Sequence, residues 1–273
     1  MGKEAKHFDL NSIQDRDVKR KLEAIGQIGT SILESQDLEK YNQITNNMEK
    51  VYSTAKVPHY KDRSKLVSLE PEVTLILGES RDPKELEYYW TEYRKVTGQK
   101  IRNYYKDYIH LTNKAAQMNG FRDGTEMKTH AYESDTFVQE MDATWQGLKP
   151  LYEQLHAYVR NRLFDHYGSN VVDPEGPIPA HLLGNMWAQS WNNIADLVKP
   201  YPKKPSLDVT QAMKDQGWTP KIMFEKAEDF FMSMGLEPMT DVFWKKSLIE
   251  KPEGRELVCH ASAWDFYKDD DFR

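Results

Sequence analysis

The residues best suited to chemistry in this sequence are its histidines, and their spacing excludes a common zinc site. No two of them are four residues apart, the spacing that places two metal ligands on one face of a helix. The sequence contains no His-Glu-x-x-His motif, no glycine-rich phosphate loop and no Gly-x-Ser-x-Gly nucleophile motif. Cys259 is the single cysteine, so no thiol pair can form. We therefore expect no bound zinc, no complete catalytic centre and a free Cys259 thiol in these 273 residues.

Gln189 is a candidate ligand-binding residue because of its apolar surroundings. A helix is predicted over 180–198, with one stripe that includes Leu182 and Met186 and another that includes Trp187 and Trp191. A polar amide on such a buried stripe needs hydrogen-bond partners. Two interpretations stay open: a core glutamine satisfied by backbone groups, or a cavity-lining amide that donates to a ligand carboxylate.

His260 and Ala261 form a second candidate region. The segment 257–261 has the character of a short strand, and small residues follow His260. Small side chains let an extended peptide approach the backbone closely, as in binding by strand addition. A satisfied core histidine is the alternative interpretation.

Composition excludes several classes of protein. The net charge is -6, with 39% hydrophobic and 29% charged residues, as in globular proteins. No basic block suggests nucleic-acid binding, and no apolar run of about 18 residues suggests a membrane span. The polar start is not a signal peptide, so the sequence by itself is typical of a cytosolic protein.

Helical patterns dominate the chain and predict an all-α fold with at most one short strand or hairpin. A long helix should begin at Asp82-Pro83 and bend near Gly98, because aspartate caps and proline favours the first helical position. A second should run from about residue 134 to Gly168 with a kink at Pro150. Further elements are a rigid loop over 173–179 and helices near 207–216, 219–234 and 239–247.

Three stretches of this sequence resemble the angiotensin-converting enzyme family, particularly its invertebrate members. They are GPIPAHLLGNMWAQSW at 176–191, QGWTP at 216–220 and VCHASAWDFY at 258–267. The resemblance implies an all-helical zinc peptidyl-dipeptidase, chloride-dependent in some members, that releases dipeptides from oligopeptides with a free C-terminus. It implies that Gln189 binds the substrate carboxylate, His260 a substrate carbonyl and Ala261, through its backbone, a substrate N–H. We predict that these groups face one shared concave surface.

The resemblance also implies what this sequence does not contain. The zinc motif of the family follows the segment matched by residues 258–267, so residues 1–273 are expected to be part of one metallopeptidase domain. That part would lack the N-terminal lid and the zinc-binding half, and would be inactive alone. A family disulfide is replaced by Pro58 and Leu66.

The same resemblance leaves the role and the location of the protein open to more than one interpretation. Family membership implies an extracellular or membrane-anchored protein. The alternatives to a peptidase fragment are a non-catalytic peptide-binding or interaction protein and a helical scaffold without a ligand. Uncovered apolar faces of the 180–198 helix are expected to favour a partner or self-association.

Overall fold

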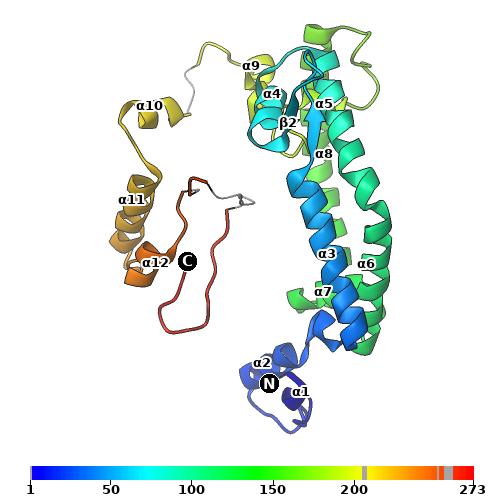
Figure 1. The fold of residues 1–273 in the computed structure, drawn as a ribbon, viewed down its shortest axis with the longest axis vertical. Coiled ribbons are helices and arrows are strands. Elements are labelled where there is room, and N and C mark those ends of the chain that lie inside the picture. The colour runs from blue at the N-terminus through cyan, green and yellow to red at the C-terminus, as the bar shows by residue number, and fades with distance from the viewer. Residues whose placement is uncertain (1, 205–207, 251, 255–260) are drawn as a thin grey trace. The chain divides into compact units, whose positions relative to one another are not determined.

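The computed structural model describes residues 2–204, 208–250, 252–254 and 261–273, and most of them are helical (Figure 1). The chain divides into two compact units, Met1–Pro200 and Tyr201–Arg273. Within the described residues the regular β-structure is one two-stranded hairpin. The predicted all-α class is therefore confirmed. None of the described helices has the length and apolar character needed to cross a membrane.

The first unit contains the longer helices. Its elements in chain order are α1 (Gly2–Ala5), α2 (Arg16–Gly26), η1 (Gly29–Ile32), α3 (Ser35–Thr54), β1 (Lys56–Pro58), β2 (Leu66–Ser68), η2 (Leu69–Val73), α4 (Thr74–Glu79), α5 (Pro83–Val96), α6 (Gly98–Met118), α7 (Gly124–Thr129), η3 (His130–Tyr132), α8 (Phe137–Tyr167), η4 (Ala180–Leu182), η5 (Asn192–Ile194) and α9 (Ala195–Val198). Helices α3 and α6 pack along each other, and α5 contacts α6, η4 and β1.

Helix α5 begins and α8 ends where capping chemistry predicts. The Asp82 carboxylate accepts a hydrogen bond from the Lys84 N–H and caps α5. A bend of one helix is predicted near Gly98, and the structure instead has two helices there, because Thr97 interrupts the helix and α6 starts at Gly98. Helix α8 continues through Pro150 and ends before Gly168, whose φ is 79°.

The hairpin β1–β2 places Pro58 directly opposite Leu66. These are the two positions where the family resemblance implies a disulfide. Without one, aromatic side chains of α5 hold the hairpin loop. The Tyr88 hydroxyl donates to the Pro58 carbonyl at 2.9 Å, and the Arg63 guanidinium lies 4.0 Å from the Tyr88 ring centre.

Two buried clusters form the core of the first unit. The larger joins the hairpin, α5, the end of α8 and the 172–194 segment, and the smaller joins η1, α3 and α6. The larger cluster consists of Val57, Val67, Val73, Leu77, Leu86, Tyr89, Tyr93, Val159, Leu163, Val172, Ile178, Leu182, Leu183, Met186 and Ile194. These side chains position the 180–198 segment against α5 and α8.

The second unit contains α10 (Thr210–Asp215), α11 (Pro220–Ser233) and α12 (Asp241–Lys246), close to the predicted ranges. None of its described residues is fully buried. The Phe243 ring contacts the rings of Phe224 and Trp244 at 5.5 and 5.1 Å between centres. Backbone hydrogen bonds join Trp264 and Arg273. This small unit thus relies on aromatic contacts and turns more than on a buried core.

Candidate functional site

The segment 180–198 is not the single helix that its apolar pattern predicts. It forms η4, an irregular turn over 183–191, η5 and the short helix α9. Gly184 has a φ of 75°, a left-handed value that ends η4 and that glycine adopts without strain. The Asn193 side chain donates to the Gly184 carbonyl at 2.8 Å. Asparagine and serine side chains compete with the helix for backbone hydrogen bonds, and this segment contains three asparagines and one serine. Their number explains why the helix does not form.

Gln189 is exposed in this irregular turn, which corrects the prediction that it lies on a buried helical stripe. Its side chain has no hydrogen bond among the described residues, so the interpretation as a satisfied core glutamine is wrong. Ala188, with a φ of 53°, precedes it, and the Trp191 indole N–H donates to the Ala188 carbonyl at 2.9 Å. The turn therefore presents the Gln189 amide to solvent, available to a ligand.

The Arg94 side chain of α5 supports the beginning of this turn. Its guanidinium donates to the Met186 carbonyl at 2.6 Å and lies 3.7 Å from the Trp90 ring centre. Burial lowers the pKa of Arg94, whose guanidinium also donates to the Trp90 carbonyl at 3.1 Å and to the Met186 sulfur at 2.9 Å. Arg94 and Arg102 both line a hollow with a volume of about 500 Å³. The Arg94 side chain therefore ties α5 to the turn that carries Gln189.

Arg94 was not identified from the sequence, because nothing in its local pattern distinguishes it from a surface arginine. The available signal was its spacing from Trp90, four residues earlier on the predicted helix.

A second arginine fixes the other end of the segment. The Arg81 guanidinium donates to the Asn193 carbonyl at 2.8 Å and to both carboxylate oxygens of Asp196 at 2.8 and 3.2 Å. It also donates to the Gly78 carbonyl at 3.0 Å. Partial burial opposes ionisation of Asp196, but the hydrogen bonds and charge of Arg81 outweigh it and lower the pKa of Asp196. Arg81 and Arg94 together anchor the turn that carries Gln189.

The second predicted site region is described only in part. His260, Cys259 and the rest of the predicted strand up to residue 260 lie outside the described residues. Ala261 is exposed and belongs to no strand. After it, the Asp271 carboxylate binds the Arg273 guanidinium at 2.8 and 2.9 Å. The hydrogen bonds and charge of Arg273 lower the pKa of Asp271. The shared surface of Gln189, His260 and Ala261 stays a prediction.

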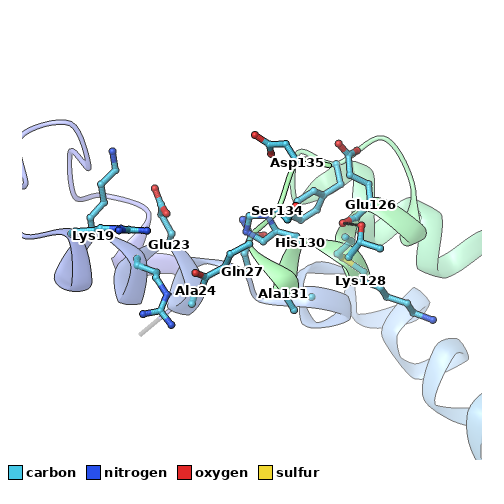
Figure 2. Close-up of a pocket in the computed structure, with 17 residues that line it drawn as sticks. Lys19, Glu23, Ala24, Gln27, Glu126, Lys128, His130, Ala131, Ser134 and Asp135 are labelled. Carbon is cyan, nitrogen blue, oxygen red and sulfur yellow. Dashed lines mark hydrogen bonds and ion pairs between the residues drawn. The ribbon is translucent and has the colours of Figure 1, made fainter. Parts of the chain in front are cut away.

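A larger hollow than the one beside Arg94 lies between α2 and the segment from α7 to residue 135 (Figure 2). Its volume is about 800 Å³, within the range of ligand pockets. Figure 2 shows Lys19 and Glu23 on one side and Glu126 and Asp135 on the other. The walls of this hollow thus carry both positively and negatively charged side chains. The predicted site residues Gln189 and Ala261 do not line it.

No cluster of three or more His, Cys, Asp or Glu side chains occurs among the described residues that could hold a metal ion. The described part of the chain therefore does not provide the three protein ligands of a catalytic zinc.

These features define an all-α protein with an exposed turn that carries Gln189. The sequence model of the angiotensin-converting enzyme family matches residues 1–273. The angiotensin-converting enzyme of Bos taurus is 48% identical over 270 residues, which are 98% of this chain and 20% of that protein. The angiotensin-converting enzyme of Haematobia irritans exigua is 44% identical over 275 residues, which are 100% of this chain and 45% of that protein. The chain belongs to the angiotensin-converting enzyme family.

The matched relatives are longer than this chain. It spans a fifth of the bovine protein and less than half of the fly protein. The angiotensin-converting enzyme-like protein Ace3 of Mus musculus is 47% identical over 98% of this chain, which corresponds to 36% of that protein. Mammalian and insect members are thus matched at similar identity.

Proposed function

We propose that this chain is the substrate-contacting part of a zinc-dependent peptidyl-dipeptidase that releases C-terminal dipeptides from oligopeptides. The observation that carries the proposal is the family match across all 273 residues, which includes the positions of Gln189, His260 and Ala261. In this proposal the Gln189 amide binds the terminal carboxylate of the substrate. The Ala261 carbonyl and the His260 side chain bind the extended peptide backbone. Such contacts position a peptide without selecting its side chains.

Hydrolysis by this enzyme class needs zinc, which supplies a metal-activated water as the nucleophile. The printed sequence holds no pair of histidines at the required spacing. The chain taken alone is therefore proposed to bind peptides weakly and to lack turnover. An extracellular or membrane-anchored location follows from the same family membership.

The test measures binding of two peptides that differ only at the C-terminus, one a free carboxylate and one an amide. Calorimetry on the wild-type chain should detect weak binding of the acid and weaker binding of the amide. Gln189→Glu should abolish the preference, since a second carboxylate repels the first. Gln43→Glu, an exposed glutamine in α3, is the matched control and should leave the preference unchanged. Equal binding of both peptides, or equal behaviour of the two variants, would contradict the role of Gln189.

Metal analysis and a dipeptide-release assay test the proposal that the chain taken alone lacks turnover. The purified 273-residue chain should contain less than stoichiometric zinc and release no dipeptide. Stoichiometric zinc with chelator-sensitive release would show that the chain is catalytic by itself. The alternative function, a non-catalytic peptide-binding protein, shares the binding result. It would be favoured if the chain bound peptides tightly without metal.

A further inference from the structure

The Gln189 side chain directly follows a tight backbone turn. The Ala188 N–H donates to the Asn185 carbonyl at 3.1 Å, the hydrogen bond that closes a four-residue turn. The Asn185 side chain accepts from the Trp187 N–H at 2.8 Å and holds the first half of the same turn. Ala188 has a φ of 53°, a left-handed value that alanine keeps only where its surroundings hold it. The direction of the Gln189 side chain therefore depends on the contacts that keep this turn in shape.

The Met186 carbonyl is the point at which the turn is tied to another element. Met186 is the second residue of the turn and is 3% exposed, and a buried carbonyl needs a hydrogen-bond donor. The Arg94 guanidinium donates to this carbonyl at 2.6 Å and to the Met186 sulfur at 2.9 Å. Because the peptide unit is planar, a bond to its oxygen fixes the whole unit between Met186 and Trp187. That unit lies two residues before Gln189.

The Arg94 side chain is itself held in place by α5. Its guanidinium lies 3.7 Å from the Trp90 ring centre and donates to the Trp90 carbonyl at 3.1 Å, one helical turn earlier. Helix α5 packs in the larger buried cluster through Leu86 and Tyr89. A planar guanidinium that is already stacked loses little further freedom when it binds the turn. A rigid helix thus sets the position of Met186.

Gln189 has no hydrogen bond of its own among the described residues that could orient its amide. On one side of it, Leu182, Leu183 and Met186 are buried, which corrects the expectation that apolar faces of the 180–198 segment are uncovered. On the other side, the Trp191 indole N–H donates to the Ala188 carbonyl at 2.9 Å. The position of the Gln189 amide therefore follows from the backbone that flanks it.

From these contacts we propose that Arg94 is a positioning residue that sets the preference of Gln189 for peptides with a free C-terminal carboxylate. The inference rests on the proposed function, in which Gln189 binds that carboxylate. Hydrogen bonds are directional, so a donor displaced by about 1 Å loses much of its bond to a fixed acceptor. Without the Arg94 bond, the peptide unit after Met186 can rotate and move the Gln189 amide. Only the carboxylate end of the peptide is affected, because the other proposed contacts come from His260 and Ala261.

Peptide binding by Arg94→Met tests the proposal. Methionine keeps an apolar stem and removes every donor. Calorimetry on the full 273-residue chain gives the dissociation constants of a peptide acid and of the same peptide as a C-terminal amide. The amide-to-acid ratio of these constants should fall at least about fivefold in Arg94→Met, as expected for a hydrogen bond to a charged group. A general loss of stability would weaken both peptides alike and leave the ratio unchanged.

Three further variants separate the contacts of Arg94. Arg102→Met removes the other guanidinium of the same hollow, which donates to no group of the turn among the described residues, and should change the ratio by no more than about twofold. Met186→Leu removes the sulfur and keeps the carbonyl, so it should also leave the ratio within about twofold. Arg94→Lys keeps a charged donor without the planar fork and should recover part of the loss. Its ratio, between those of wild type and Arg94→Met, also serves as the test if Arg94→Met does not fold.

Hydrogen exchange of the Trp187 and Ala188 N–H groups reports on the turn itself. It should be faster in Arg94→Met than in wild type and unchanged in Arg102→Met. A wild-type chain that binds acid and amide equally would refute the role of Gln189 and, with it, the role of Arg94. A wild-type preference that Arg94→Met retains, or that Arg102→Met reduces equally, would overturn the positioning role alone and leave the proposed function in place.

Discussion

Arg81→Met tests whether an ionic clamp holds the turn that carries Gln189. Arg81 joins the end of α4 to η5 and α9 through five hydrogen bonds, which reach the Asn193 carbonyl, the Gly78 carbonyl and the Asp196 carboxylate among others. Methionine keeps an apolar stem of similar length and removes every donor. The variant thus changes the clamp while leaving most of the packing intact.

The expected cost follows from the contacts that are lost. Two inter-element carbonyls, those of Gly78 and Asn193, lose a charged donor, at about 1 kcal/mol each. The ion pair with Asp196 is partly exposed, because the two side chains are 27% and 57% accessible, so it adds about 0.5 kcal/mol after screening. We expect Arg81→Met to lower the free energy of unfolding of the first unit by about 2–3 kcal/mol.

Asp196→Asn separates the ionic part by its pH dependence. The pKa of Asp196 is lowered in the folded chain, so its ionised form stabilises the fold above the unfolded pKa of about 3.9. That contribution is lost as the pH falls through the folded pKa. The stability difference between the wild type and Asp196→Asn should therefore be present at pH 7 and shrink as the pH falls below about 3.9.

Urea unfolding followed by circular dichroism measures the stability, and hydrogen exchange of residues 184–194 localises the effect. Arg162→Met is the matched control, because Arg162 makes one exposed pair with Asp165 on the same helix. It should cost less than about 0.5 kcal/mol. If Arg81→Met cost no more than Arg162→Met, or left exchange at 184–194 unchanged, the clamp would be refuted.

Two further predictions concern local geometry, one at a glycine with a positive φ and one at the β1–β2 hairpin. Gly184→Ala should lower the free energy of unfolding by about 2 kcal/mol or more, because the φ of 75° is strained for alanine and the new Cβ would lie 2.9 Å from the Asn193 Cβ. Gly120→Ala, with a φ of 91° and no atom within 4 Å, should cost only the strain of about 1 kcal/mol, and equal costs in urea melts would contradict the packing argument. Pro58→Cys with Leu66→Cys should form a disulfide and stabilise the hairpin by about 2–3 kcal/mol, since the positions are cross-strand partners. Mass spectrometry of the oxidised chain and melting with and without reductant check it, and a failure to oxidise would show that the side chains do not meet.

Local signals in the sequence determined the long helices of this protein. The cap at Asp82, the break at Gly98 and the stop at Gly168 act within one turn of the backbone, so they can be recognised without knowing the fold. The three tryptophan-rich stretches allowed the family to be recognised from the sequence alone. That resemblance also implied the candidate roles of Gln189, His260 and Ala261. The spacing of the histidines excluded a helical zinc pair for a purely local reason.

Tertiary structure decided which local structure the apolar stretches adopt and which of their side chains are buried. The stripe of 180–198 and the stripe of α8 are alike in sequence, yet the first is folded into an irregular turn with Leu182 and Met186 buried. The second lies in one continuous helix, α8. Gly184 adopts its left-handed φ where Asn193, nine residues later, packs against it. Arg81 reaches the turn from the loop between α4 and α5, and Arg94 reaches it from α5. Burial depends on which surfaces the rest of the chain supplies. Contacts between residues 92 and 112 positions apart, such as Arg94 with Met186 and Arg81 with Asn193, leave no periodic signal in the sequence.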